Sequence, residues 1–205
     1  MTALWVVLAV LYGLFLYWHE RRGPPLTQAE TDAVLAHLAT NRIAADASDH
    51  DLPMSLRALA AGDDGRQYFM VNLIQYREHA LYPPGHEGFG IDARAADARY
   101  SRIVLPQLLK RGSYPIFVSR VVGAFIPHTG ATKWDVVAIV RYRSRRDMLD
   151  MVKALQKLGG GMHKWAAIED THVFPVHAVI RVAPLPVVVL LLLLALGFAV
   201  TALLS

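Results

Sequence analysis

The segment Arg66–Tyr76 reads RQYFMVNLIQY and decides the fold of the chain. It is rich in aromatic and β-branched residues, which predicts a β-strand. Successive side chains of a strand point to opposite faces of the sheet. One face then carries Tyr68, Met70, Asn72, Ile74 and Tyr76, and the other carries Phe69, Val71 and Leu73. Because both faces are apolar, both need cover: helices can cover one, and a second sheet or subunit the other.

The segments that follow this strand alternate between helical and extended patterns. Asp92 is a suitable N-cap for a helix over residues 95–110, and Gly112 ends that helix. Strand-like sequences then cover 114–126 and 134–142, with a turn-rich connection between them. The chain therefore returns from one helix into a pair of neighbouring strands.

A second helix and a last strand complete the pattern. Ser144 caps a helix in which apolar residues recur at intervals of three and four, until the glycines at 159–161 end it. The last strand is predicted over 171–182. The resulting order, β-α-β-β-α-β, is that of the ferredoxin-like unit and predicts an α+β fold with an antiparallel sheet. We expect a second copy to cover the open sheet face and to close a barrel across a two-fold axis.

Both ends of the chain are uncharged and apolar. Residues 185–204 read LPVVVLLLLLALGFAVTALL, and residues 3–18 read ALWVVLAVLYGLFLYW. At about 1.5 Å per helical residue, the first of these runs is roughly 30 Å long, the thickness of a bilayer core. The sequence therefore divides into an N-terminal transmembrane anchor (1–22), a linker with an extra helix (23–65), the α+β domain (66–182) and a C-terminal transmembrane helix (183–205).

The N-terminal run indicates an uncleaved anchor rather than a signal peptide. Nothing basic precedes it, and it ends in bulky aromatic residues, which make a poor cleavage site. Arg21 and Arg22 follow it directly, and Arg181 precedes the C-terminal run. The positive-inside rule then places these arginines and the domain in the cytoplasm. We expect a two-pass protein of the inner or plasma membrane, with both termini outside.

Composition excludes several kinds of chemistry. The chain has 205 residues, no cysteine, and a formal net charge of +4. It therefore has no disulfide, thiolate metal site or cysteine nucleophile. The charge is mild and indicates membrane topology rather than nucleic-acid binding. The 9 histidines have no spacing typical of a metal or haem site, and no nucleotide-binding or serine-nucleophile motif occurs. We expect no metal, no cofactor and no nucleic-acid partner.

The basic run RYRSRR (141–146) contains Arg143, Arg145 and Arg146, at the end of a strand and the start of a helix. Charges at such an edge are ordinarily solvated. A domain that is tethered at both ends also favours a second interpretation, in which these arginines contact anionic lipid headgroups at the membrane surface.

Six polar or aromatic residues in or just after the strands are candidates for ligand binding: Asn72, Tyr76, His79, Tyr82, Trp134 and Arg141. An asparagine in so apolar a strand needs a hydrogen-bond partner when it is buried. If its face is the barrel interior, Asn72 and Tyr76 line a pocket, with His79 and Tyr82 at its rim. The alternative is a hydrogen-bonded asparagine in a purely structural barrel.

The domain also resembles a known family. The segments that carry the resemblance are MVNLIQYRE (70–78), LPQLLKRG (105–112), WDVVAIVRYRSRRDMLDMV (134–152) and EDTHVFP (169–175). Together they are similar to the dimeric α/β-barrel superfamily, and most closely to the domain-of-unknown-function family numbered 1330. The resemblance covers about residues 66–180 and implies a homodimer with a central cavity. The superfamily includes oxygenases, isomerases, haem enzymes and ligand sensors, so the fold does not select a function.

Three hypotheses about function follow. In the first, the domain is a homodimer that binds a small lipophilic molecule, or holds an integral-membrane partner protein, at a lipid surface. In the second, it is a cofactor-independent oxygenase or isomerase that acts on a membrane-soluble substrate. In the third, it is an auxiliary subunit of a larger membrane complex, and the terminal helices make its main contacts.

Overall fold

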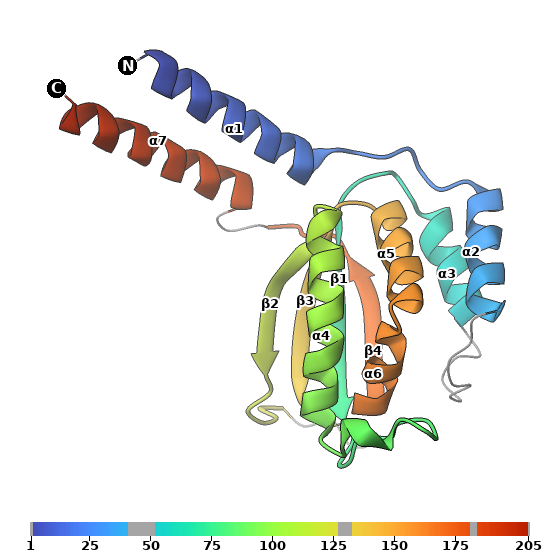
Figure 1. Ribbon diagram of the computed structural model, residues 1–205. Helices are drawn as coiled ribbons and strands as arrows, with labels where there is room; N and C mark the ends of the chain where they lie inside the picture. Colours follow the sequence, from blue (N-terminus) through green and yellow to red (C-terminus); the bar gives the residue numbers. More distant parts are fainter. Residues whose placement is uncertain (1, 41–51, 127–132, 181–183, 205) are drawn as a thin grey trace. The chain divides into compact units, whose positions relative to one another are not determined.

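A computed structural model describes residues 2–40, 52–126, 133–180 and 184–204 (Figure 1). The chain forms two compact units. One consists of residues 1–21 together with 178–205, and the other of residues 22–177. The first contains both terminal helices, and the second contains the sheet.

The larger unit is built on a four-stranded antiparallel sheet with the order β2-β3-β1-β4. The strands are β1 (Tyr68–Tyr76), β2 (Tyr114–Arg120), β3 (Val136–Tyr142) and β4 (Ile168–Val176). The strand predicted to be apolar on both faces is β1, and it lies inside the sheet, paired with β3 on one side and β4 on the other. A central strand needs apolar side chains on both faces, which explains its sequence.

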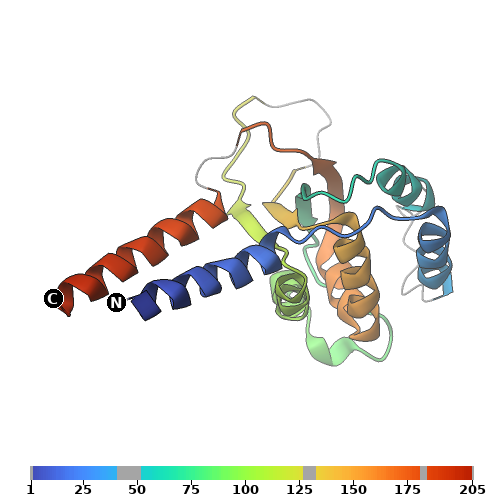
Figure 2. The same ribbon diagram turned by 90° about the horizontal axis from the view of Figure 1, so that it is seen from above.

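The helices that connect the strands all cover one face of this sheet (Figure 1, Figure 2). Helix α4 (Ala93–Lys110) joins β1 to β2, and α5 (Arg145–Lys157) with α6 (Gly160–Ala167) joins β3 to β4. The core under α5 contains Tyr68 and Met70 of β1 together with Met148, Leu149, Met151 and Leu155. The predicted α+β domain, with an antiparallel sheet and two apolar terminal helices, is confirmed.

Side chains and backbone amides define the helix ends as the sequence predicts. The Asp92 carboxylate accepts hydrogen bonds from the backbone N–H groups of Arg94 (2.8 Å) and Ala95 (3.2 Å) at the start of α4. The Ser144 hydroxyl accepts one from the N–H of Asp147 (3.1 Å) at the start of α5. Gly159 has a φ of 68° between α5 and α6, a left-handed conformation that glycine adopts without strain.

Two strands end earlier than their sequences suggest. β2 stops at Arg120 rather than at residue 126, because Arg120 pairs with Val136, the first residue of β3. β4 stops at Val176, short of the predicted 171–182, because Val176 pairs with Phe69 near the beginning of β1; residues 181 and 182 lie outside the described residues. In both strands the apolar sequence continues, but the partner strand does not.

Residues 23–65, predicted as a linker with an extra helix, contain α2 (Gln28–Thr40) and α3 (Leu52–Ala61). Thr27 and Glu30 form a capping box at the start of α2: the N–H of Thr27 donates to Glu30 Oε2 (2.9 Å), and the N–H of Glu30 donates to Thr27 Oγ1 (3.3 Å). Val34 and Leu56 are buried in the same core as Tyr68. This segment therefore completes the core of the larger unit.

The smaller unit contains α1 (Thr2–Glu20) and α7 (Leu185–Leu203), both long and apolar enough to cross a membrane. The two helices are antiparallel. The rings of Trp5 and Phe198 lie 5.3 Å apart near the termini, and the Tyr12 hydroxyl donates to the carbonyl of Pro186 (3.2 Å) farther along. A Cβ atom at Gly197 would lie 2.6 Å from the Trp5 ring, so glycine permits this close approach.

Candidate functional site

Asn72 and Tyr76 lie on the sheet face that the helices cover, together with Tyr68 and Met70. They do not point to the face that a second copy would cover, so they do not line the interior of a barrel made in that way. The Asn72 side-chain nitrogen donates to the carbonyl oxygens of Met70 (3.1 Å) and Ala138 (3.2 Å). These bonds satisfy the side chain within the sheet and favour the structural alternative for Asn72.

Tyr76 is held in a polar network at the end of β1. Its hydroxyl donates to Asp97 Oδ2 (2.7 Å), and its backbone N–H donates to Asp135 Oδ2 (2.8 Å). The Arg94 guanidinium lies 5.0 Å from the centre of the tyrosine ring. Burial, with the hydrogen bond to Asp97, raises the pKa of Tyr76 well above its ordinary value. The hydroxyl is therefore a stable proton donor across the physiological pH range.

Tyr82 lies in the loop after β1 and contacts His163 of α6. Its hydroxyl is 2.9 Å from His163 Nδ1. The His163 residue is 8% exposed, and the Phe89 ring meets its imidazole edge to face at 4.9 Å. Burial, together with the charges of Arg99 and His86, lowers the pKa of His163, so its imidazole is neutral at pH 7.

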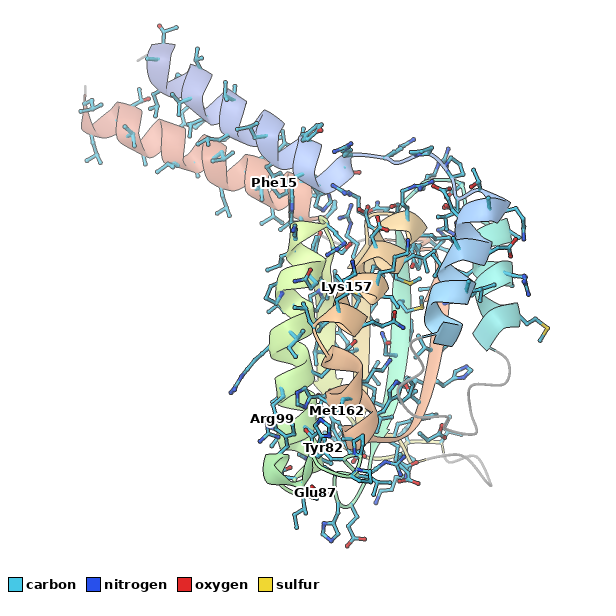
Figure 3. The ribbon with its side chains drawn as sticks, turned by 45° about the vertical axis from the view of Figure 1, so that its right-hand side comes forward. Phe15, Tyr82, Glu87, Arg99, Lys157 and Met162 are labelled. Atoms are coloured by element: carbon cyan, nitrogen blue, oxygen red, sulfur yellow. The ribbon has the colours of Figure 1, made fainter. Side chains whose placement is uncertain are left out.

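The two tyrosines are brought together by small residues where α4 crosses α6. Tyr76 and Tyr82 both pack on a buried cluster formed by Ala96, Ala166, Ala167 and Ile168. Alanine side chains let the two helices approach closely, and the loop after β1 closes over the contact. Figure 3 shows the labelled Tyr82 and Arg99 in this region, beside Met162 of α6. Two of the predicted ligand residues therefore belong to one site.

The other predicted ligand residues lie elsewhere. His79 is exposed. Trp134, which precedes Asp135 in the chain, is partly buried. Arg141 is 2% exposed at the opposite end of β1, where its Nε donates to Gln67 Oε1 (2.7 Å) and its Nη1 to the carbonyl of Gly112 (2.6 Å). Both partners are acceptors within the domain, so Arg141 connects β3 to the segments that lead into β1 and β2.

The residues that complete the site are Asp97, Arg99, Asp135 and His163, which the sequence did not single out. No motif links them, because they come from α4, from the segment before β3 and from α6. One feature of the sequence could have indicated the residues that α4 contributes. A helix capped by Asp92 directly after the β1 loop must place its first polar turns near the end of β1.

The basic run is bound within the domain. Arg143 forms an ion pair with Asp147 (2.7 Å), and Arg145 forms one with Asp63 (3.2 Å). Arg146 pairs with Glu30. Arg145 is 6% exposed. These contacts favour a structural role over contact with lipid headgroups: Arg145 and Arg146 join α5 to residues 23–65, and Arg143 is paired within the start of α5.

One pocket in the described part of the domain is lined by α2 and α5. Its volume is about 100 Å³, and in it Val34 and Leu149 face Glu30 and Arg146. Sites for drug-sized ligands usually measure roughly 300–1,000 Å³, so this pocket is too small for one. Within the described ranges, no three His, Asp or Glu side chains are placed to hold a metal ion.

No protein-family model matches the chain, and no curated protein sequence matches it either. Two solved structures of the protein RPA0582 are similar in fold: one of the methylated protein, and one described as a protein of unknown function from Rhodopseudomonas palustris. Both are 22% identical to this chain with a TM-score of 0.55, and they cover 62% of it and 92% and 94% of their own lengths. At this identity the likeness shows the fold alone.

Proposed function

We propose that the protein is a membrane-anchored binding module, with a ferredoxin-like domain of the dimeric α/β-barrel type. The element order β-α-β-β-α-β and the strand order β2-β3-β1-β4 support the ferredoxin-like assignment. The two apolar terminal helices support anchoring in a membrane. The relationship to family 1330 and its barrel-forming superfamily is part of the same proposal.

The observation that carries the proposal is the sheet face opposite the helices. The strand register places on this face, called the open face below, the apolar side chains of Val71, Leu73, Val137, Ile139, Phe174 and, on β2, Phe117, together with the polar side chains of Arg141, His172 and Ser119. Phe117 is 51% exposed. The connecting helices α4, α5 and α6 all lie on the other side (Figure 2). Burying such apolar surface stabilises a complex by about 25 cal/mol per Å² removed from water.

The occupant that we propose for the open face is a second copy of the chain. A copy related by a two-fold axis presents the same apolar pattern, so the surface is complementary to itself. Both copies are anchored in one membrane, and an axis along the membrane normal keeps both anchors on the same side. Confinement to the membrane also raises the local concentration of one copy around the other.

The ligand that fits this arrangement is a small lipophilic molecule that partitions into the bilayer. Two open faces packed into a barrel line its interior with mainly apolar side chains, and the α2–α5 pocket is too small to take this role. The outer surfaces of α1 and α7, where Leu14 is 62% and Leu192 64% exposed, fit lipid or an integral-membrane partner protein.

The proposed topology places the domain in the cytoplasm and both termini outside. Arg21 and Arg22 are exposed directly after α1, where the positive-inside rule expects cytoplasmic charge. Arg181 lies outside the described residues. An antiparallel helix pair puts both termini on one side. A terminal tag that reacts with an impermeant label on intact cells supports this topology, and a tag that reacts only after permeabilisation contradicts it.

Native mass spectrometry of the full chain in detergent tests the proposed function. We expect a dimer that retains a small apolar molecule. Phe117→Asp, at an exposed position of the open face, should convert the dimer to a monomer. Leu105→Asp introduces the same charge at a residue of α4 that is 42% exposed, and it should leave the dimer intact. A monomer in the unchanged protein, or equal effects of both variants, contradicts the proposal.

A further inference from the structure

The loop between β1 and α4 is closed on itself and fixed to α6. The N–H of Ala80 donates to the carbonyl of Ile91 (2.7 Å), which joins the two ends of the loop. The N–H of Leu81 donates to the carbonyl of Ala166 (2.9 Å) in α6. Compact loops with joined ends often carry functional residues. Residues 80–91, called the closed loop below, therefore form a defined surface over the first turns of α4.

Arg99 of α4 faces this loop, and one of its guanidinium nitrogens has no hydrogen-bond partner among the described residues. Its guanidinium carbon lies 5.6 Å from the centre of the Phe89 ring. Its Nη1 is buried and has no hydrogen-bond partner among the residues that the structure describes. A buried cationic donor without an anion is unfavourable, because it loses its hydration and gains no partner. Arg99 as a whole is partly exposed, so an anion from outside can approach its side chain and supply an acceptor for the guanidinium.

The neighbouring carboxylates accept hydrogen bonds from donors other than Arg99. Asp97 accepts from the Tyr76 hydroxyl, and Asp92 accepts from backbone N–H groups at the start of α4. Glu87 Oε1 accepts from the N–H of Gly85 (2.9 Å) within the closed loop. The ion pairs observed among the described residues include none with Arg99. The anion that balances Arg99 is therefore expected from outside this part of the chain.

The surroundings of Arg99 indicate what the anion is attached to. Three apolar side chains of the closed loop are exposed: Phe89 is 37%, Leu81 67% and Ile91 68% exposed. The imidazole of His163 and the hydroxyl of Tyr82, which bond to each other at 2.9 Å, add polar groups beside Phe89. Cationic and polar groups next to exposed apolar side chains suit an amphipathic molecule.

We propose that the closed loop and Arg99 form a binding site for the carboxylate head of an amphipathic, fatty-acid-like molecule. The carboxylate pairs with the Arg99 guanidinium, which can bind two oxygens of one anion. The apolar chain lies along Phe89, Leu81 and Ile91. The site is on the helix side of the sheet, so it does not depend on the open face or on a second copy.

The test uses the full chain in nanodiscs of neutral phosphatidylcholine and a decanoic acid that carries a photoreactive diazirine. Peptide mapping after illumination should find the label in residues 80–91. Unlabelled decanoate should compete, whereas decanol, which has the same chain without the charge, should not. Arg99→Gln should weaken binding by about tenfold or more, because it removes a charge-assisted hydrogen bond. Arg102→Gln, an exposed arginine on the same helix, should bind as the unchanged protein does.

Thermal unfolding separates a lost site from a lost fold. Arg99→Gln removes a charge that forms no ion pair among the described residues, so its unfolding midpoint should equal or exceed that of the unchanged protein. Labelling spread over the whole chain, or unaffected by Arg99→Gln, overturns the proposal. Equal competition by decanol would show that the site does not recognise the carboxylate of the ligand. Equal competition by inorganic phosphate overturns the amphipathic ligand and leaves a free anion as the occupant.

Discussion

Asp63 should be one of the residues on which the stability of the larger unit depends most, although it lies in the segment that the sequence describes as a linker. Its side chain is 0% exposed, and that of Arg145 is 8% exposed. Asp63 Oδ1 accepts from Arg145 Nη1 (3.2 Å) and from the N–H of Gly65 (3.0 Å), while Oδ2 accepts from the N–H of Leu26 (2.8 Å). The Asp63→Ala change therefore leaves a buried guanidinium and two backbone donors without this acceptor.

The expected loss follows from this geometry. Removing one member of a buried ion pair costs about 3–5 kcal/mol. Arg145 keeps a second, longer contact of 3.7 Å to Asp64, whose side chain is 47% exposed. This contact places the expected loss of unfolding free energy near the lower end, at about 3 kcal/mol. Asp64→Ala is the matched control, because an exposed pair contributes only about 0–1 kcal/mol.

Thermal unfolding of the full chain in detergent, followed by tryptophan fluorescence, measures the difference. For a domain of this size, 1 kcal/mol shifts the midpoint by about 2–4 °C, so Asp63→Ala should lower it by roughly 6–12 °C. Asp64→Ala should lower it by no more than about 4 °C. Equal shifts for the two variants would show that residues 23–65 do not depend on this buried pair, and the reasoning from burial would be refuted.

Three further predictions concern other parts of the chain. Gly197→Leu should separate α1 from α7, because a Cβ there would lie 2.6 Å from Trp5, whereas Gly13→Leu should not, because a Cβ there meets nothing within 4 Å. Cross-linking of cysteines introduced at Tyr12 and Pro186 measures the pairing of the two helices, and equal yields for the two variants would contradict the packing. Hydrogen bonds from Arg146 and Thr27 lower the pKa of Glu30 from 4.5 to about 2, so the contribution of Glu30 to stability is present above pH 4.5 and is lost as the pH falls through 2. The difference in unfolding midpoint between the unchanged protein and Glu30→Gln should therefore shrink over that window, and a constant difference would argue against the pairing. Tyr76→Phe should destabilise the fold by about 1.5 kcal/mol in denaturant titrations, because it removes a hydrogen bond to a carboxylate, and an unchanged midpoint would mean that the Asp97 contact contributes nothing.

The sequence was informative where structure depends on local pattern. The β1 segment, the caps at Asp92 and Ser144 and the apolar termini all have periodicities or side-chain rules that act within a few residues. The ends of the strands were harder to predict from the sequence, because β2 and β4 stop where their partner strands stop rather than where their own apolar sequences stop. Asp63 and Arg145 are far apart in the chain, and neither has a local pattern that reveals the pairing.

The candidate site shows the same division. Tyr76 and Tyr82 could be singled out because they are polar or aromatic residues at the end of a recognisable strand. Their partners Asp97 and His163 could not, since the contacts arise from the crossing of α4 over α6. The assignment of Asn72 to a barrel interior depended on which sheet face the helices cover, and strand alternation alone leaves that choice open.

The central claim is that two copies of the domain meet through the open face while both are anchored in the membrane. The chain contains no cysteine, so a single introduced thiol reports only on its own position. A photoreactive benzophenone attached through a maleimide to the thiol of Phe117→Cys should, on illumination in native membranes, cross-link two copies of the chain, whereas the same group on Leu105→Cys, on the opposite side of the sheet, should leave the chain monomeric. A dimer formed only by Leu105→Cys, or by neither variant, would contradict the claim.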